Sequence, residues 1–111
     1  MRRLNILACC LSLVLAASLA PAQKKGKGEP EKGKEVFEQC GVCHNADSDE
    51  KKMGPGLKGL FKKATFADGK TKVSEDSVRS KVNVGGNGMP AYQEMLTDEE
   101  RDHLIAFLKT L

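Results

Sequence analysis

Five consecutive residues, Cys40-Gly41-Val42-Cys43-His44, contain the side chains best suited to hold a cofactor. On a helical turn, residues three apart lie on one face, so both thiols can reach groups along one edge of a flat ring. The imidazole follows directly and can bind a metal from the same side. Cys-x-x-Cys-His is the attachment signature for c-type haem, in which the cysteines form thioethers and the histidine binds iron.

Other cysteine chemistries fit the sequence less well. Of the four cysteines, Cys9 and Cys10 lie in the apolar N-terminal run, which leaves Cys40 and Cys43 in the folded part. A zinc site needs about four ligands, and structural disulfides usually close longer loops. A thioredoxin-like pair needs a βαβ setting, and the sequence has no strong strand pattern. A haem-free thiol oxidoreductase remains an alternative.

A second ligand to the iron is predicted at Met89. It follows the glycine-rich stretch 85–88 and precedes Pro90, which fixes its own φ and favours an extended Met89. A methionine sulfur is a soft ligand that pairs with histidine at electron-transfer haems. Met53 and Met95 compete for this role, but Met53 is tied to the turn after His44. Met95 lies near the next helix, where a core position explains it.

Three helices should position these residues. Pro30 opens the first, because proline suits the first helical turn, and Phe37 lies on its apolar side. Ser74 caps the second, whose buried stripe is Val78 and Val82. The glycines of 85–88 end it.

Thr97 and Glu100 form a capping box that begins the third helix, which is expected to run to the chain end. Its core stripe is Leu104, Phe107, Leu108 and Leu111, and its expected partner is the helix that contains Gly33. His103 is interpreted as a partly exposed structural histidine, with iron ligation as the alternative. In the Gly54-Pro55-Gly56 turn, a backbone carbonyl can accept the second imidazole N–H of His44.

Residues 1–22 have the pattern of a secretory signal, with Arg2 and Arg3, an apolar run and a small-x-small site ending at Ala22. Cleavage there is favoured; an uncleaved membrane anchor or lipidation at Cys9 or Cys10 are the alternatives. Residues 23–30 form a flexible polar linker, and residues 31–111 form the single domain.

Composition limits the functional classes. At 111 residues the chain cannot bury a large core, and it has no Trp, so an apolar cofactor would compensate. The net charge is +3, and the leader contributes two basic residues, so bulk charge gives no indication of nucleic-acid binding. The middle third is basic and is either solvated surface or a rim that steers an acidic redox partner. Its lysines are Lys51, Lys52, Lys58, Lys62, Lys63, Lys70 and Lys72.

From Gly33 to Leu111 the chain resembles a small monohaem class I cytochrome c. The resemblance rests on Gly33 and Phe37, Cys40-x-x-Cys43-His44, Gly54-Pro55-x-Leu57, Gly88-Met89-Pro90, and the terminal helix with Leu104 and Phe107. It implies an all-α class I cytochrome c-like fold, with a few helices wrapped around one covalently bound haem c. It also implies that Cys40 and Cys43 bind the haem and that His44 and Met89 are the axial ligands.

With both axial positions filled by the protein, the expected function is single-electron transfer rather than enzymatic catalysis. The expected partners are redox proteins, such as a membrane respiratory complex, an oxidase or a reductase. We expect an exported, periplasmic monomer, with anchorage on the outer side of a membrane as the alternative. A haem enzyme or ligand sensor with a labile sixth ligand is the alternative function.

Overall fold

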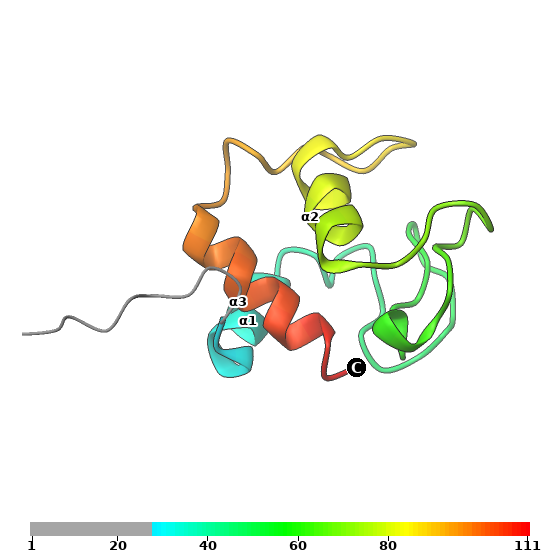
Figure 1. Ribbon diagram of the computed structural model, residues 1–111, viewed down its shortest axis with the longest axis horizontal. Coiled ribbons are helices and arrows are strands. Elements are labelled where there is room, and N and C mark those ends of the chain that lie inside the picture. The colour runs from blue at the N-terminus through cyan, green and yellow to red at the C-terminus, as the bar shows by residue number, and fades with distance from the viewer. Residues whose placement is uncertain (1–27) are drawn as a thin grey trace, which may run out of the picture.

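The computed structural model describes residues 28–111, which form three α-helices joined by long loops (Figure 1). The elements are α1 (Pro30–Phe37), the short 3₁₀ helix η1 (Leu60–Lys62), α2 (Glu75–Val84) and α3 (Asp98–Leu108). Within this part of the chain, β-structure is limited to two isolated bridges, Thr65 with Lys72 and Gly86 with Met89. The predicted all-α class is therefore confirmed.

The predicted leader, residues 1–22, lies outside the described residues, as do residues 23–27 of the predicted linker. Among residues 28–111, no helix is both long enough and apolar enough to cross a membrane.

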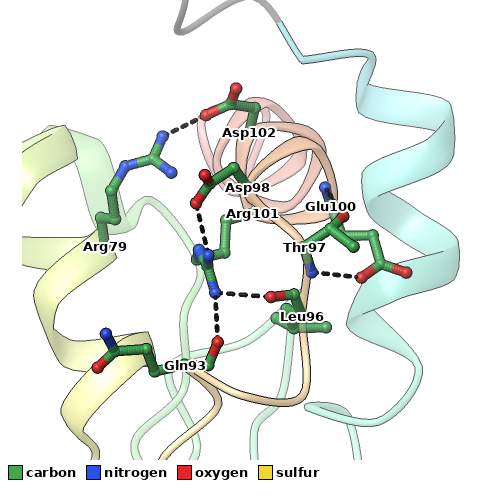
Figure 2. Close-up of polar contacts among 8 residues, drawn as sticks. All are labelled: Arg79, Gln93, Leu96, Thr97, Asp98, Glu100, Arg101 and Asp102. Atoms are coloured by element: carbon green, nitrogen blue, oxygen red, sulfur yellow. Dashed lines mark hydrogen bonds and ion pairs between the residues drawn. The ribbon is translucent and has the colours of Figure 1, made fainter.

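The predicted helix starts are confirmed, and those of α2 and α3 carry capping boxes. α1 begins at Pro30, and Ser74 caps α2 by accepting the N–H of Ser77 at 3.0 Å. At the start of α3, the N–H of Thr97 donates to the Glu100 carboxylate at 2.8 Å (Figure 2). Each box satisfies backbone N–H groups that have no partner within the helix.

The prediction that the last helix runs to the chain end is wrong, because α3 ends at Leu108. The backbone N–H and the hydroxyl of Thr110 both donate to the carbonyl of Phe107, at 2.9 and 2.6 Å. A local side-chain bond of this kind competes with the helical pattern, so the last residues form a turn.

α1 crosses α3 closely, as predicted (Figure 1). A Cβ at Gly33 would overlap the carbonyl oxygen of His103 and come within 2.7 Å of the Phe107 Cβ. The Phe37 and Phe107 rings pack beside this contact, with centroids 5.3 Å apart and planes tilted by 52°. The absence of a side chain at Gly33 lets the two helix backbones meet.

His103 is buried, with 8% of its surface exposed, so the prediction of a partly exposed histidine is wrong. Its Nδ1 accepts the backbone N–H of Glu29 at 2.8 Å. Glu29 is the N-cap residue of α1 and makes no side-chain cap of its own. The His103 imidazole on α3 therefore accepts a hydrogen bond from the backbone at the start of α1. The close crossing of the two helices buries this imidazole.

One small apolar core lies between the helices and the loops. Its buried members are Phe37, Leu60, Val78, Val82, Leu96, Leu104, Ile105 and Leu108. The core position predicted for Met95 is wrong, because its side chain is 61% exposed. The N–H groups of Met95 and Leu96 both bond to the Tyr92 carbonyl, and in this turn Leu96 is the residue that reaches the core.

The substitution Gly33→Ala tests the helix crossing. Helix propensity alone would raise the free energy of unfolding by about 1 kcal/mol. Overpacking against His103 costs about 1–3 kcal/mol or more, so we expect a net decrease in the free energy of unfolding measured with guanidinium. Lys34→Ala, at an exposed α1 position, should change the value by no more than about 0.5 kcal/mol. A more stable Gly33→Ala protein would contradict the close crossing.

Candidate haem site

A cavity of about 660 Å³ lies beside the core. This volume is within the range of pockets that enclose cofactors. Cys40, Cys43, His44 and Met89 all line it. A second, smaller recess of about 90 Å³ shares several of these residues and is otherwise mostly apolar. Its apolar lining residues are Phe37, Leu57, Leu60, Phe66, Val78, Val82, Leu104 and Leu108. The structure thus brings together all four predicted site residues.

The cysteines lie on a tight turn that continues from α1. The N–H groups of Cys40 and Gly41 bond to the Phe37 carbonyl, both at 2.8 Å. Those of Cys43 and His44 bond to the Cys40 carbonyl, at 3.1 and 3.0 Å. These bonds give the helix-like turn that the motif requires, although α1 itself ends at Phe37.

The His44 ring is oriented by the predicted turn. Its Nδ1 lies 2.8 Å from the carbonyl oxygen of Pro55. A carbonyl can only accept, so Nδ1 carries the proton, and the Nε2 lone pair of the neutral ring is left for a metal. A Cβ at Gly54 would lie only 2.5 Å from the ring Cε1. The backbone at Gly54 therefore packs directly against the imidazole.

Met89 lies at the end of a tight loop after α2. All four residues of Gly85-Gly86-Asn87-Gly88 have positive φ, between 52° and 114°. Glycine adopts this region freely, and asparagine tolerates it better than most residues. Gly86 and Met89 exchange two backbone hydrogen bonds of 3.0 and 3.1 Å, which close the loop.

The competing ligands have different locations. Met53 also lines the cavity, with its sulfur 3.9 Å from the Cys43 sulfur, but its side chain is 81% exposed. Met95 and His103 are not among the lining residues. The N-cap bond to Glu29 occupies Nδ1 of His103. Among the methionines of residues 28–111, Met89 and Met53 therefore remain as candidate ligands, because both line the cavity together with Cys40 and Cys43.

The cysteine environment does not favour thiol redox chemistry. Burial, with a smaller contribution from Cys43, raises the pKa of the Cys40 thiol to about 11. Reactive cysteines need a lowered pKa, because the thiolate is the nucleophile. Burial also raises the pKa of the nearby Tyr92 phenol, and Cys40 and Cys43 add to the shift. This argues against the alternative of a thiol oxidoreductase.

The polar part of the cavity lining includes residues that sequence reasoning did not identify. Asp68 accepts hydrogen bonds from the Thr71 hydroxyl at 2.6 Å and from the N–H groups of Lys70 and Thr71 at 2.8 and 2.9 Å. These bonds, the Thr71 hydroxyl first, lower the pKa of Asp68 to about 2. Of the lysines, Lys51 and Lys81 line the cavity.

The fold and the cavity together are those of an all-α protein built around a flat cofactor held by a Cys-x-x-Cys-His turn. The family model for cytochrome c matches residues 30–111. Cytochrome c6 from Thermosynechococcus vestitus is 32% identical over 114 residues, covering 97% of this chain and 91% of that protein.

Two further comparisons agree. Cytochrome c2 from Blastochloris viridis is 49% identical over 49 residues, which are 43% of this chain and 36% of that relative's length. The structure of cytochrome c6 from the diatom Phaeodactylum tricornutum superimposes with a TM-score of 0.59 and 27% identity, over 75% of this chain and 93% of that one.

This chain belongs to the cytochrome c family. It is a monohaem electron-transfer protein, and its haem c is covalently bound through cysteines. Cys40 and Cys43 are the cysteines of the described part of the chain.

The lowered pKa of Asp68 makes a pH-dependent prediction. A carboxylate with a depressed pKa stabilises the folded state above its ordinary value of about 3.9. That contribution should be lost as pH falls through about 2. NMR titration should place the Asp68 midpoint near 2 and show faster exchange of the Lys70 and Thr71 amides below it. Thr71→Val should raise the midpoint, and Asp68→Asn should abolish the transition. A wild-type midpoint near 3.9 would contradict the turn.

Proposed function

We propose that Cys40 and Cys43 form the two thioethers and that His44 and Met89 are the axial ligands of an electron carrier. The observation that carries this assignment is the convergence of these four side chains on one cavity. The Nδ1–Pro55 hydrogen bond supports His44, because it fixes the ring and leaves Nε2 for the metal. The closed loop at 85–89 supports Met89, because it holds the residue in place.

The residues present fit a haem. When bound, haem iron supplies a one-electron couple whose potential depends on its ligands and burial. The chain's own contribution is to saturate the coordination with His44 and Met89, which excludes oxygen and small ligands. The second recess has a mostly apolar lining, and an apolar environment around the bound ring would favour the less charged reduced state. The protein thus acts as a carrier rather than as an enzyme.

Partners are proposed to dock over the cavity opening. Three large apolar side chains, Val42, Met53 and Val84, are 68–81% exposed, and Met53 and Val84 line the cavity. Lys51 also lines the cavity. Lys63, by contrast, already forms an ion pair with Asp49 at 2.7 Å. An apolar contact surface beside a positive charge fits a redox protein with an acidic docking site, such as a respiratory complex, an oxidase or a reductase.

The proposed organisation of the chain is an export leader at 1–22, a linker at 23–30 and a cytochrome domain at 31–111. The contact between Glu29 and His103 ties the end of the linker to the domain. The export pattern of the leader supports a periplasmic location. N-terminal sequencing of the native protein would distinguish a cleaved leader from a retained anchor.

The substitution Met89→Leu tests the ligand assignment. It keeps the apolar volume but removes the sulfur, so the Met-to-iron charge-transfer band of the oxidised protein should disappear. Carbon monoxide should then bind the reduced protein, and the reduction potential should fall. Visible spectra and a redox titration measure all three.

Met53→Leu and Met95→Leu are the matched controls, and both should keep the band. Loss of the band in Met53→Leu instead would assign the ligand to Met53. A wild-type protein that binds carbon monoxide readily would favour the alternative of a sensor or enzyme with a labile sixth ligand.

Charge steering is tested with Lys51→Gln. Removing a positive charge at the cavity should slow reduction by anionic hexacyanoferrate(II) roughly two-fold at low salt. Stopped-flow rates should converge with those of wild type as salt rises, because screening removes the effect. The control Lys34→Gln, an exposed residue on α1, should leave the rate close to wild type. Equal effects of the two variants would contradict local steering.

A further inference from the structure

Arg101 is buried although it is charged, with 8% of its surface exposed. Its guanidinium donates from Nη1 to the carbonyls of Gln93 and Leu96, at 3.1 and 2.8 Å, and from Nη2 to the Asp98 carboxylate at 2.6 Å (Figure 2). Arginine is almost never fully buried unless it is paired. Here two of its three acceptors are backbone carbonyls of the segment that leads into α3.

The same segment is also fastened to α2. The N–H of Tyr92 donates to the Val82 carbonyl at 2.9 Å, and that of Gln93 donates to the Asn83 carbonyl at 3.3 Å. Arg101 therefore holds residues 93–96 from the α3 side while the end of α2 holds 92–93. Figure 1 shows this stretch returning from the loop beyond α2 to the start of α3.

Only two residues, Pro90 and Ala91, separate this anchored segment from Met89. On the other side, Met89 is bonded to Gly86. The position of Met89 thus depends on two fixed points, the loop closure at Gly86 and the anchor at Tyr92–Gln93. Arg101 adds a bond to the Gln93 carbonyl at the second of these points.

We propose that Arg101 is a positioning residue for the distal ligand: it anchors the return arm of the loop and so holds the Met89 sulfur at the cavity. This rests on the proposed role of Met89 as an axial ligand. An anchored loop loses little conformational freedom when the sulfur binds the metal, whereas a loose loop loses more. The Met89 bond should therefore open more often when Arg101 is removed.

A general loss of stability must be separated from this specific role. Arg79 provides the matched control, because its guanidinium forms an ion pair with Asp102 and joins α2 to α3 (Figure 2). Like Arg101, it is an arginine paired with an aspartate of α3. Unlike Arg101, it has no hydrogen bond to the backbone of residues 93–96 among the contacts of the described chain.

The experiment compares R101Q, R101K and R79Q in the haem-loaded, oxidised protein. Cyanide binding measures how often the Met89 position opens, the charge-transfer band measures the bond itself, and circular dichroism measures global unfolding. R101Q should bind cyanide roughly ten-fold faster, the size expected for losing a hydrogen bond from a charged donor. R101K retains a charged donor but not the planar fork, so it should give an intermediate rate.

R79Q should lower the unfolding midpoint but leave the cyanide rate within about two-fold of wild type. Equal acceleration in R79Q and R101Q, or none in R101Q, would overturn the positioning role. If R101Q does not fold, the comparison of R101K with R79Q decides in the same way. A wild-type protein without the band would overturn the Met89 assignment, whereas a wild-type band together with an unchanged cyanide rate in R101Q would overturn only the role of Arg101.

Discussion

The close crossing of α1 and α3 at Gly33 is the contact on which both halves of the haem site depend. α1 leads directly into the turn that holds Cys40 and His44. α3 carries Arg101, which fastens the segment returning from Met89. Because the two helix backbones meet where no side chain intervenes, the ends that reach the cavity are fixed relative to each other. One backbone contact thus connects two proposed ligands that are far apart in the sequence.

The core is small, and most of it lines the second, mostly apolar recess. Phe37, Leu60, Val78, Val82, Leu104 and Leu108 belong both to the core and to the lining of the recess. A domain of this size buries too little apolar surface to be very stable alone. A bound apolar ring would complete the same core, and ligand binding adds directly to folding stability. Cofactor attachment is therefore expected to stabilise the fold of this protein.

Polar contacts do the remaining work of positioning. A carbonyl of the 54–56 turn orients His44, the capping boxes fix the starts of α2 and α3, and buried Arg101 accounts for the shape of the loop before α3. Each of these contacts bonds a backbone N–H or carbonyl that has no partner within a helix or sheet. Such groups must find hydrogen-bond partners, and a chain with many loops has many of them. The long loops can therefore hold defined positions without a sheet.

The sequence alone determined the helix starts, the Cys40–His44 turn and the turn whose carbonyl orients His44, because caps, proline and motif spacing act over a few residues; the structure identified that carbonyl as Pro55's. It also indicated Met89, because a short, glycine-rich loop precedes it and Pro90 restricts its backbone. Tertiary structure decided the burial of His103 and Arg101, the exposure of Met95 and which lysines reach the cavity. Burial depends on which backbone groups other segments bring near, and a local pattern does not contain that information. The sequence thus named the side chains that line the cavity, while packing decided what holds them in place.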